Sequence, residues 1–220
     1  MNSTRVSFLN KRGEKLAGIL DTPMTPTTRY ALFAHCFTCS KNLKTASNIS
    51  QALTAAGIAV LRFDFTGLGQ SEGDFEDTSF SSNVSDLLEA ANYLAEHHEA
   101  PLLLVGHSLG GTAVLQAAPQ VPSAVAVATI GSPADPAHVS HLFQDSRAEI
   151  DAKGIGEVHI GGRPFTIKKE FLEDLERHDL VAELGQLRKA LLIMHAPLDD
   201  TVEIDHAGML FQAAKHPKSF

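Results

Sequence analysis

The sequence predicts an α/β domain in which a mostly parallel sheet is covered by helices on both faces. Short apolar runs alternate along the chain with segments of helical periodicity. Because the runs are apolar at nearly every position, the strands should be buried on both faces, as in parallel sheets. With 220 residues, 44% of them hydrophobic, the chain can bury one full core, so we expect a single domain over residues 1–220.

Two expected strands near the N-terminus, Arg5–Leu9 and Lys15–Leu20, are separated by the turn residues Lys11–Glu14. So short a connection predicts an antiparallel hairpin at one edge of the sheet. The remaining expected strands are Tyr30–Ala34, Ile58–Phe63, Leu102–Val105, Ala124–Ile130 and Leu191–Met194.

Helical periodicity fills four further segments, at residues 45–56, 83–97, 108–118 and 204–214. In the second of them the apolar residues follow the i, i+3, i+4, i+7 spacing, which predicts one face packed on the sheet. Ser82 or Asn83 is expected to cap the N-terminus of that helix.

Residues 131–189 interrupt this alternation. They contain a hairpin-like segment, Glu157–Ile160 and Arg163–Ile167 across Gly161-Gly162, and a charged helical segment near 168–178. Long insertions into a compact α/β unit are usually lids or binding loops, so we expect a lid-like insertion here. The alternative is a surface elaboration without a role in substrate handling.

A Gly-x-Ser-x-Gly pentapeptide, Gly106–Gly110, joins the apolar run Leu102–Val105 to the helical segment 108–118. A strand, a tight turn around serine and a helix form the context in which this motif carries a nucleophile. The turn should hold Ser108 in strained backbone geometry, while the flanking glycines leave room where a Cβ would collide. The hydroxyl would then lie at the positive end of a helix, where an oxyanion is stabilised. The alternative is an ordinary glycine-rich turn.

Charge and composition exclude several classes of protein. A net charge of −8 argues against nucleic-acid binding, which requires a basic patch. No apolar run approaches the roughly 20 residues needed to span a bilayer, and the first residues lack the apolar region of a signal peptide. With two cysteines and no export signal, we expect a cytoplasmic protein.

Three motifs together resemble the α/β-hydrolase family, and the resemblance runs the whole length of the chain. They are Ala34–Phe37 after the third strand, Asp64–Ser71 after the fourth, and Gly106–Gly110. The segments His35–Asn42 and His216–Phe220 are similar to hydrolase domains that precede an OsmC-like domain in bacterial proteins. The family fold implies eight strands in the order 1-2-4-3-5-6-7-8, with the active site at the carboxyl ends of the strands. General rules for open α/β sheets predict the same location.

Hydrolysis through serine needs a base, an acid that orients the base, and donors for the oxyanion. This fold presents them in the chain order Ser, Asp or Glu, His. Ser108 is the expected nucleophile, and Asp199 is the expected acid because it follows the carboxyl end of the strand Leu191–Met194. Asp200 and Asp135 remain as alternatives, and the Asp199-Asp200 pair could instead only cap a turn.

Two backbone N–H groups should form the oxyanion hole. The first expected donor is Leu109, directly after the nucleophile. The resemblance implies Phe37 as the second, although Cys36 stands where most relatives have glycine. Each donor typically contributes about 3–4 kcal/mol to the transition state.

No histidine of the chain fits the role of general base. The family fold places that histidine after an eighth strand, and Lys218–Phe220 resembles only the opening of such a strand. His206 falls within a predicted helix, and His216 precedes the strand. The other candidates are expected to be structural: His35, His107 and His195. We therefore expect the base to lie beyond Phe220 and the final strand to be missing or incomplete by C-terminal truncation, because an unpaired seventh strand would expose an apolar edge.

Two weaker motifs do not change this interpretation. Cys36 and Cys39 form a single C-x-x-C pair without a second pair or histidines at ligand spacing, so a metal or redox site is not expected. Gly67–Gly73 imitates a dinucleotide loop, but the acidic residues Asp74–Asp77 that follow would repel a pyrophosphate. We expect no cofactor and no metal.

Two functional hypotheses follow. The first is a serine hydrolase, an esterase that acts on a small or medium acyl ester through an acyl-enzyme. The second is a non-catalytic module of the same fold that scaffolds or binds a C-terminal OsmC-like domain. Expected partners are a small-molecule ester and either a fused C-terminal domain or a second copy of the chain, with no nucleic acid and no membrane.

Overall fold

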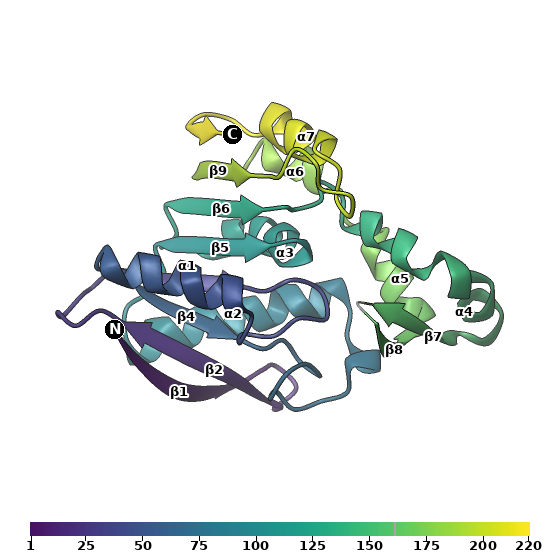
Figure 1. Ribbon diagram of the computed structural model, residues 1–220, viewed down its shortest axis with the longest axis horizontal. Coiled ribbons are helices and arrows are strands. Elements are labelled where there is room, and N and C mark those ends of the chain that lie inside the picture. The colour runs from purple at the N-terminus through teal and green to yellow at the C-terminus, as the bar shows by residue number, and fades with distance from the viewer. Residues whose placement is uncertain (161) are drawn as a thin grey trace.

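The computed structural model describes residues 1–160 and 162–220, and a sheet of eight strands forms its centre (Figure 1). The strand order is β1-β2-β4-β3-β5-β6-β9-β10, as the resemblance implied. The strands are β1 (Asn2–Leu9), β2 (Lys15–Thr22), β3 (Tyr30–Ala34), β4 (Ala59–Phe63), β5 (Leu103–His107), β6 (Ala126–Ile130), β9 (Ala190–Met194) and β10 (Lys218–Ser219).

The N-terminal hairpin is confirmed, because β1 pairs antiparallel with β2 over their whole lengths. β2 also runs antiparallel to β4, while β4, β3, β5, β6, β9 and β10 are parallel to one another. The predicted mostly parallel sheet is therefore confirmed, and the carboxyl ends of its parallel strands all meet at one edge.

At the other end of the strand order, the eighth strand is present as a two-residue strand. Lys218 pairs with Leu191 and Ser219 with Leu192, so the edge of β9 is covered over that length. Leu192 and Met194 of β9 remain 43% and 39% exposed.

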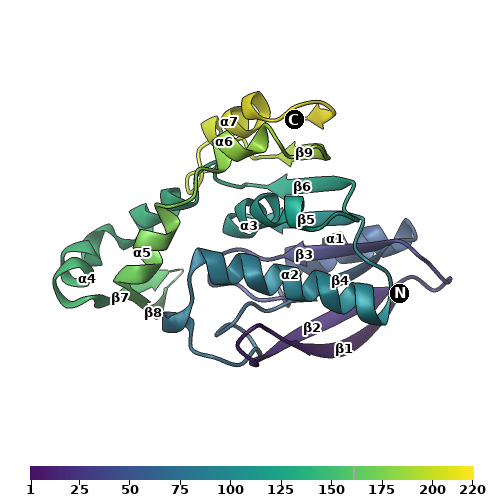
Figure 2. The same ribbon diagram turned by 180° about the vertical axis from the view of Figure 1, so that it is seen from behind.

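Helices cover both faces of the sheet (Figures 1 and 2). Helix α1 (Lys44–Ala55) packs over one face, while α2 (Phe80–His97), α3 (Leu109–Ala117) and α7 (Asp205–Ala213) pack over the other. Short 3-10 turns, η1 (Phe75–Asp77) and η2 (Ala118–Gln120), complete the connections. The larger core lies under α2 and α3, and a smaller one lies under α1.

The cap of α2 differs from the prediction. The helix begins at Phe80 and Ser79 caps it, so the expectation of Ser82 or Asn83 as cap is wrong. Ser79 Oγ accepts a hydrogen bond from Ser82 N–H, and Ser82 Oγ accepts one from Ser79 N–H. This reciprocal pair satisfies two free N–H groups, and it lets the fully buried Phe80 add one turn to the apolar face.

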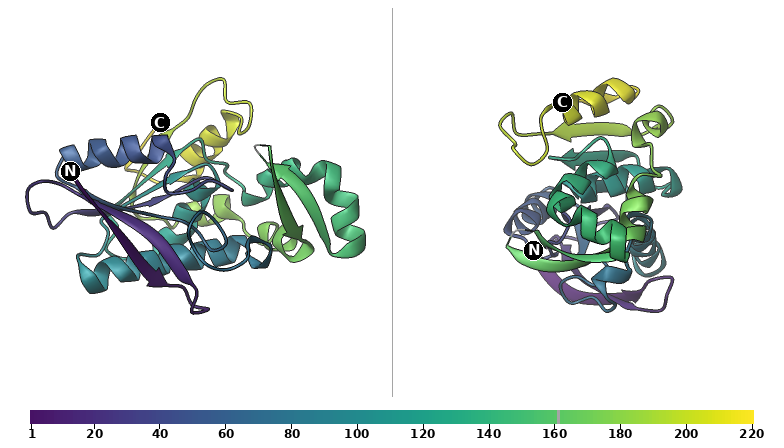
Figure 3. Two further views of the ribbon diagram at one scale, coloured as in Figure 1. Left: turned by 60° about the horizontal axis from the view of Figure 1, so that its bottom comes forward. Right: turned by 90° about the vertical axis from the view of Figure 1, so that its right-hand side faces the viewer.

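The middle of the 131–189 insertion forms a separate lobe beyond the carboxyl ends of the parallel strands (Figure 3). Its elements are η3 (Pro136–Ser146), α4 (Arg147–Lys153), β7 (Ile155–Ile160), β8 (Arg163–Lys168) and α5 (Lys169–Leu175). The last helix of the insertion, α6 (Leu180–Leu184), packs against α3 and α7 instead. The predicted hairpin is confirmed as the antiparallel pair β7–β8, and Gly161 of its turn lies outside the described residues. The lobe therefore stands at the edge where the site was expected.

Candidate active site

Ser108 occupies the sharp turn between β5 and α3. Its φ of 54° and ψ of −130° lie in a region that L-residues rarely adopt, as the sequence predicted. A Cβ on Gly110 would lie 2.7 Å from the carbonyl oxygen of Ala34 and closer still to that of His35. A Cβ on Gly106 would meet the backbone of Gly110. Both glycines are therefore required for the strand, the turn and the next loop to approach one another.

The loop after β3 packs directly against the start of α3. Phe37 and Leu109, the two expected oxyanion donors, line one small cavity together with His35 and Gly110. Close backbone approach at Gly110 holds the two segments together. The expected donors thus come from neighbouring segments on either side of Ser108.

Cys36 and Cys39 are joined by a disulfide, which the sequence did not predict. The bond closes the turn in which Cys39 N–H donates to Cys36 O. Between them, Thr38 has a φ of 62°. The side chain of Arg163, from β8 of the insertion, donates to Thr38 O. The insertion and the loop that carries Phe37 are therefore in direct contact.

Ser108 and Asp199 open onto one pocket of about 390 Å³. The pocket also contains side chains from the insertion and from the loop that follows Asp199. The lining residues are Cys36, Phe37, His107, Ser108, Gly131, His138, Val139, His141, Leu142, Ile160, Asp199, Thr201 and Val202. The structure thus brings together the expected nucleophile, the expected acid and Phe37.

Asp199 is held by its own loop. Its Oδ1 accepts hydrogen bonds from the N–H groups of Thr201 and Val202, each at 3.0 Å. Its Oδ2 points toward Gly131 at the end of β6, where a Cβ would lie 3.3 Å away. The backbone of Ser108 is tied to the same strand end, since Ser108 N–H donates to Ile130 O at 2.9 Å. The carboxylate and the nucleophile therefore flank one strand end.

The two alternative acids lie elsewhere. Asp200 is exposed, and Asp135 caps η3 by accepting a hydrogen bond from Ala137 N–H at 2.8 Å. Neither lines the pocket. Asp199 is therefore the best placed of the three candidates.

Two histidines lie next to the expected triad members, and His195 is held by a hydrogen bond to the backbone. His195 Nε2 donates to Val202 O at 2.7 Å and lies 3.8 Å from Asp199 Oδ2. His107 precedes Ser108, and burial lowers its pKa while the Asp199 carboxylate partly offsets the shift. Its Nδ1 is buried and has no hydrogen-bond partner among the described residues. The bond to Val202 O agrees with the structural role expected of His195, while the role of His107 stays a prediction.

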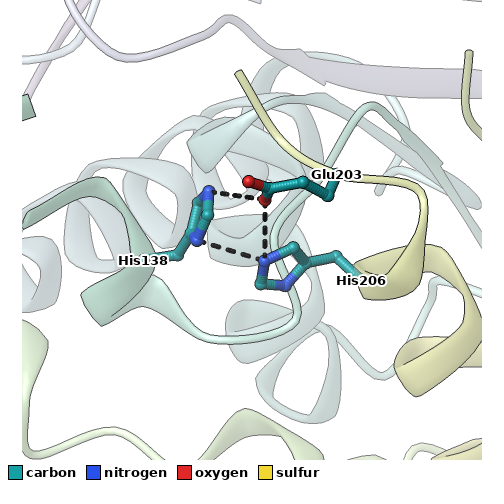
Figure 4. Close-up of side chains that lie close together, drawn as sticks. All are labelled: His138, Glu203 and His206. Carbon is teal, nitrogen blue, oxygen red and sulfur yellow. Dashed lines mark hydrogen bonds and ion pairs between the residues drawn. The ribbon is translucent and has the colours of Figure 1, made fainter. Parts of the chain in front are cut away.

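Sequence reasoning missed two other histidines. His138 and His141, in η3 of the insertion, line the pocket with Ser108. His206, expected only as a helix residue, lies against His138, with His206 Nε2 3.1 Å from His138 Nδ1 (Figure 4). The one signal in the sequence was the His138-x-x-His141 spacing, which places both rings on one turn.

His138, His206 and Glu203 place one potential ligand atom each within 4.8 Å of one another, a spacing that suits a transition metal (Figure 4). The hydrogen bonds do not fit a metal. Ala134 N–H donates to His206 Nδ1 at 3.1 Å, so in the neutral ring the proton sits on Nε2, the nitrogen that faces the cluster. A metal-bound histidine has the opposite arrangement, in which the outer nitrogen donates. We therefore assign the cluster to hydrogen bonding.

His35, next to the loop that carries Phe37, makes stability depend on pH. Its Nδ1 donates to Cys36 O at 2.8 Å, Phe65 N–H approaches its Nε2 at 3.4 Å, and burial lowers its pKa to about 4. In the unfolded chain the His35 side chain is protonated below about pH 6.5, whereas in the folded chain it is protonated only below about pH 4. The contribution to stability is therefore complete above pH 6.5 and is lost as the pH falls toward 4, by about 3 kcal/mol.

Urea unfolding between pH 7 and pH 4.5 measures this dependence. His35→Asn removes the titrating group and keeps a donor toward Cys36, so it should flatten the loss of stability. His159→Asn changes an exposed histidine and should leave the loss unchanged. An equal pH dependence in the parent chain and in His35→Asn would contradict the assignment.

Comparison with known proteins agrees with this geometry. The model of the alpha/beta hydrolase family matches residues 31–211, most of the chain. The chain belongs to the α/β-hydrolase family. Its sequence is 49% identical to that of the esterase domain of a Rhodothermus marinus protein, which has a crystal structure. The two structures superpose with a TM-score of 0.79, and the match covers 100% of this hydrolase and 87% of that domain.

Curated relatives include the human mitochondrial palmitoyl-protein thioesterase ABHD10, at 25% identity over 205 residues. The alignment covers 90% of this hydrolase and 65% of ABHD10, so the hydrolase spans slightly under two thirds of that relative. The solved structure of mouse alpha/beta hydrolase domain-containing protein 10 is 22% identical, with a TM-score of 0.78 over 98% of the hydrolase and 86% of that chain. At that identity the likeness shows the fold alone. Within the described residues, none of the helices has the length and apolarity required to cross a membrane.

Proposed function

We propose that this α/β hydrolase is a serine esterase that works through an acyl-enzyme. The observation that carries the proposal is the strained turn that presents Ser108 to a pocket shared with Asp199 and Phe37. A strained backbone at a candidate nucleophile is typical of a functional site. The names of relatives as esterases and thioesterases support the same reaction class.

In the proposed reaction, Ser108 Oγ attacks the carbonyl carbon of the ester while a base removes the hydroxyl proton. The N–H groups of Phe37 and Leu109 stabilise the oxyanion, and the alcohol departs with that proton. Water then attacks the acyl-enzyme, and the acid product leaves. Asp199 would orient the base and stabilise its cation.

The base remains assigned to a histidine beyond Phe220, as the sequence predicts. Three histidines close to the pocket support this assignment, because each has a backbone carbonyl as a fixed partner. His138 Nε2 bonds to Thr201 O, His141 Nδ1 to His138 O and His195 Nε2 to Val202 O. The fusion to an OsmC-like domain and the cytoplasmic location also stay predictions.

The lining of the pocket supports a small or medium acyl group. Its volume of about 390 Å³ lies near the lower end of ordinary ligand sites. Apolar side chains from the insertion, Val139, Leu142 and Ile160, line it together with Phe37 and Val202. We propose that these residues enclose the acyl chain, which makes the insertion part of the substrate site.

A fluorophosphonate probe, applied to the full-length gene product, tests the proposal. We expect one covalent adduct per chain, located on Ser108 by mass spectrometry and absent from Ser108→Ala. Ser140→Ala, which removes another hydroxyl of the insertion, should label normally. Acetyl and butyryl esters should compete with the probe better than hexadecanoyl esters.

Two results would contradict this proposal. Equal labelling of the parent protein and Ser108→Ala would exclude Ser108 as nucleophile. No labelling at all would favour the non-catalytic module.

A further inference from the structure

A chain of hydrogen bonds links the insertion to the loop that carries Asp199. Ala134 N–H donates to His206 Nδ1 at 3.1 Å, and His206 Nε2 lies 3.1 Å from His138 Nδ1. His138 Nε2 in turn lies 3.0 Å from Thr201 O. Thr201 N–H donates to Asp199 Oδ1. His138 belongs to η3 and His206 to α7, so the chain spans two segments far apart in the sequence (Figure 4).

The two ends of this chain determine where its protons are. A backbone N–H can only donate, so His206 Nδ1 accepts from Ala134 and His206 carries its proton on Nε2. A backbone carbonyl can only accept, so His138 carries its proton on Nε2, toward Thr201 O. His138 Nδ1 is then free to accept from His206 Nε2–H. One arrangement of neutral rings satisfies every bond.

We propose that His138 is a positioning residue for Asp199, through which the insertion holds the 199–202 loop. The inference rests on the proposed function, in which Asp199 is the acid. Thr201 and Val202 donate their N–H groups to Asp199 Oδ1, while their carbonyl oxygens accept from His138 and His195 respectively. The carboxylate therefore keeps its direction only while both histidines hold the loop.

The hydrogen-bond chain requires neutral rings on His138 and His206. A proton added to His138 would place an N–H group on each of the two nitrogens that lie 3.1 Å apart. Burial, followed by the neighbouring His138, lowers the pKa of His206, which preserves the neutral form. Glu203 opposes this, with Oε2 3.7 Å from His138 Nε2 and 3.8 Å from His206 Nε2. The other titratable groups facing the pair are Asp135, His141, His195 and Asp199. The chain of hydrogen bonds is therefore intact at neutral pH and is broken on acidification.

Three variants of the full-length protein test the proposal. His138→Phe keeps a ring but removes the hydrogen bonds to His206 and to Thr201 O. His138→Gln keeps a donor toward Thr201 O. As a control, His159→Phe alters an exposed ring of the same insertion. In His138→Phe we expect the Thr201 and Val202 amides to exchange hydrogen about tenfold faster and the fluorophosphonate to label Ser108 about tenfold more slowly. His138→Gln should restore most of both. His159→Phe should match the parent.

The outcomes distinguish failure of the proposed function from failure of the positioning role of His138. If the parent protein does not label, the proposed function fails, while amide exchange still reports on the hydrogen-bond chain. If exchange accelerates but labelling does not slow, or if neither changes, His138 does not position Asp199. If circular dichroism shows that His138→Phe is unfolded, His206→Gln takes its place, because it interrupts the hydrogen-bond chain one step earlier.

Discussion

Lys41→Met should lower the free energy of unfolding by about 3–5 kcal/mol, because it leaves the carboxylate of Asp64 buried without its cation. Lys41 Nζ donates to Asp64 Oδ2, and the two side chains are 2% and 0% exposed. Methionine has a similar length but no charge. Chemical denaturation at neutral pH measures the loss.

The pair also connects two loops at the site. Asp64, after β4, accepts hydrogen bonds from Lys41 N–H at 2.6 Å and from Gln70 N–H at 2.9 Å. Lys41 follows the Cys36–Cys39 turn, so the same contacts hold the loop that carries Phe37. Lys41→Met should therefore also slow the labelling of Ser108.

Lys168→Met is the matched control. Lys168 pairs with Asp77, but their side chains are 34% and 51% exposed, and exposed ion pairs contribute about 0–1 kcal/mol. A loss of stability of similar size in both variants would show that burial does not govern the Lys41–Asp64 pair.

Gly110→Ala should destabilise the protein by about 2–3 kcal/mol and abolish labelling of Ser108. The new Cβ would meet the carbonyl oxygens of Ala34 and His35, which are backbone atoms that cannot rotate away. The start of α3 and the loop after β3 would have to separate. That movement would pull apart the proposed oxyanion donors, the N–H groups of Leu109 and Phe37.

Gly208→Ala controls for the general effect of alanine in a helix. Gly208 lies within α7, and a Cβ added there would have no atom within 4 Å. Alanine there should stabilise the protein by about 0.5–1 kcal/mol through helix propensity alone. Urea unfolding and probe labelling distinguish the two variants. A Gly110→Ala variant as stable and as reactive as the parent would contradict the close approach of the two segments.

Local patterns were enough to predict the buried strands and the turn around Ser108, while the strand order came from the resemblance to a family. The strands and the turn depend on residues near in sequence: apolar runs that form buried strands, and glycines that permit one sharp turn. Asp199 could also be predicted, because the residue after a parallel strand must lie at the carboxyl edge of the sheet. The start of α2 was misjudged by one turn, since Ser79 and Ser82 compete locally as caps and burial of Phe80 decides between them.

By itself, the sequence determined which strand ends carry Ser108 and Asp199, the proposed nucleophile and acid, because chain order and strand polarity set those positions. Only the tertiary structure decided what surrounds them: the Cys36–Cys39 disulfide, the contact of Arg163 with Thr38, and the bonds from Ala134 through His206 and His138 to Thr201. Contacts between distant segments depend on how the insertion packs and on which proton each ring carries. Neither the packing of the insertion nor the position of a ring proton produces a repeating pattern in the sequence.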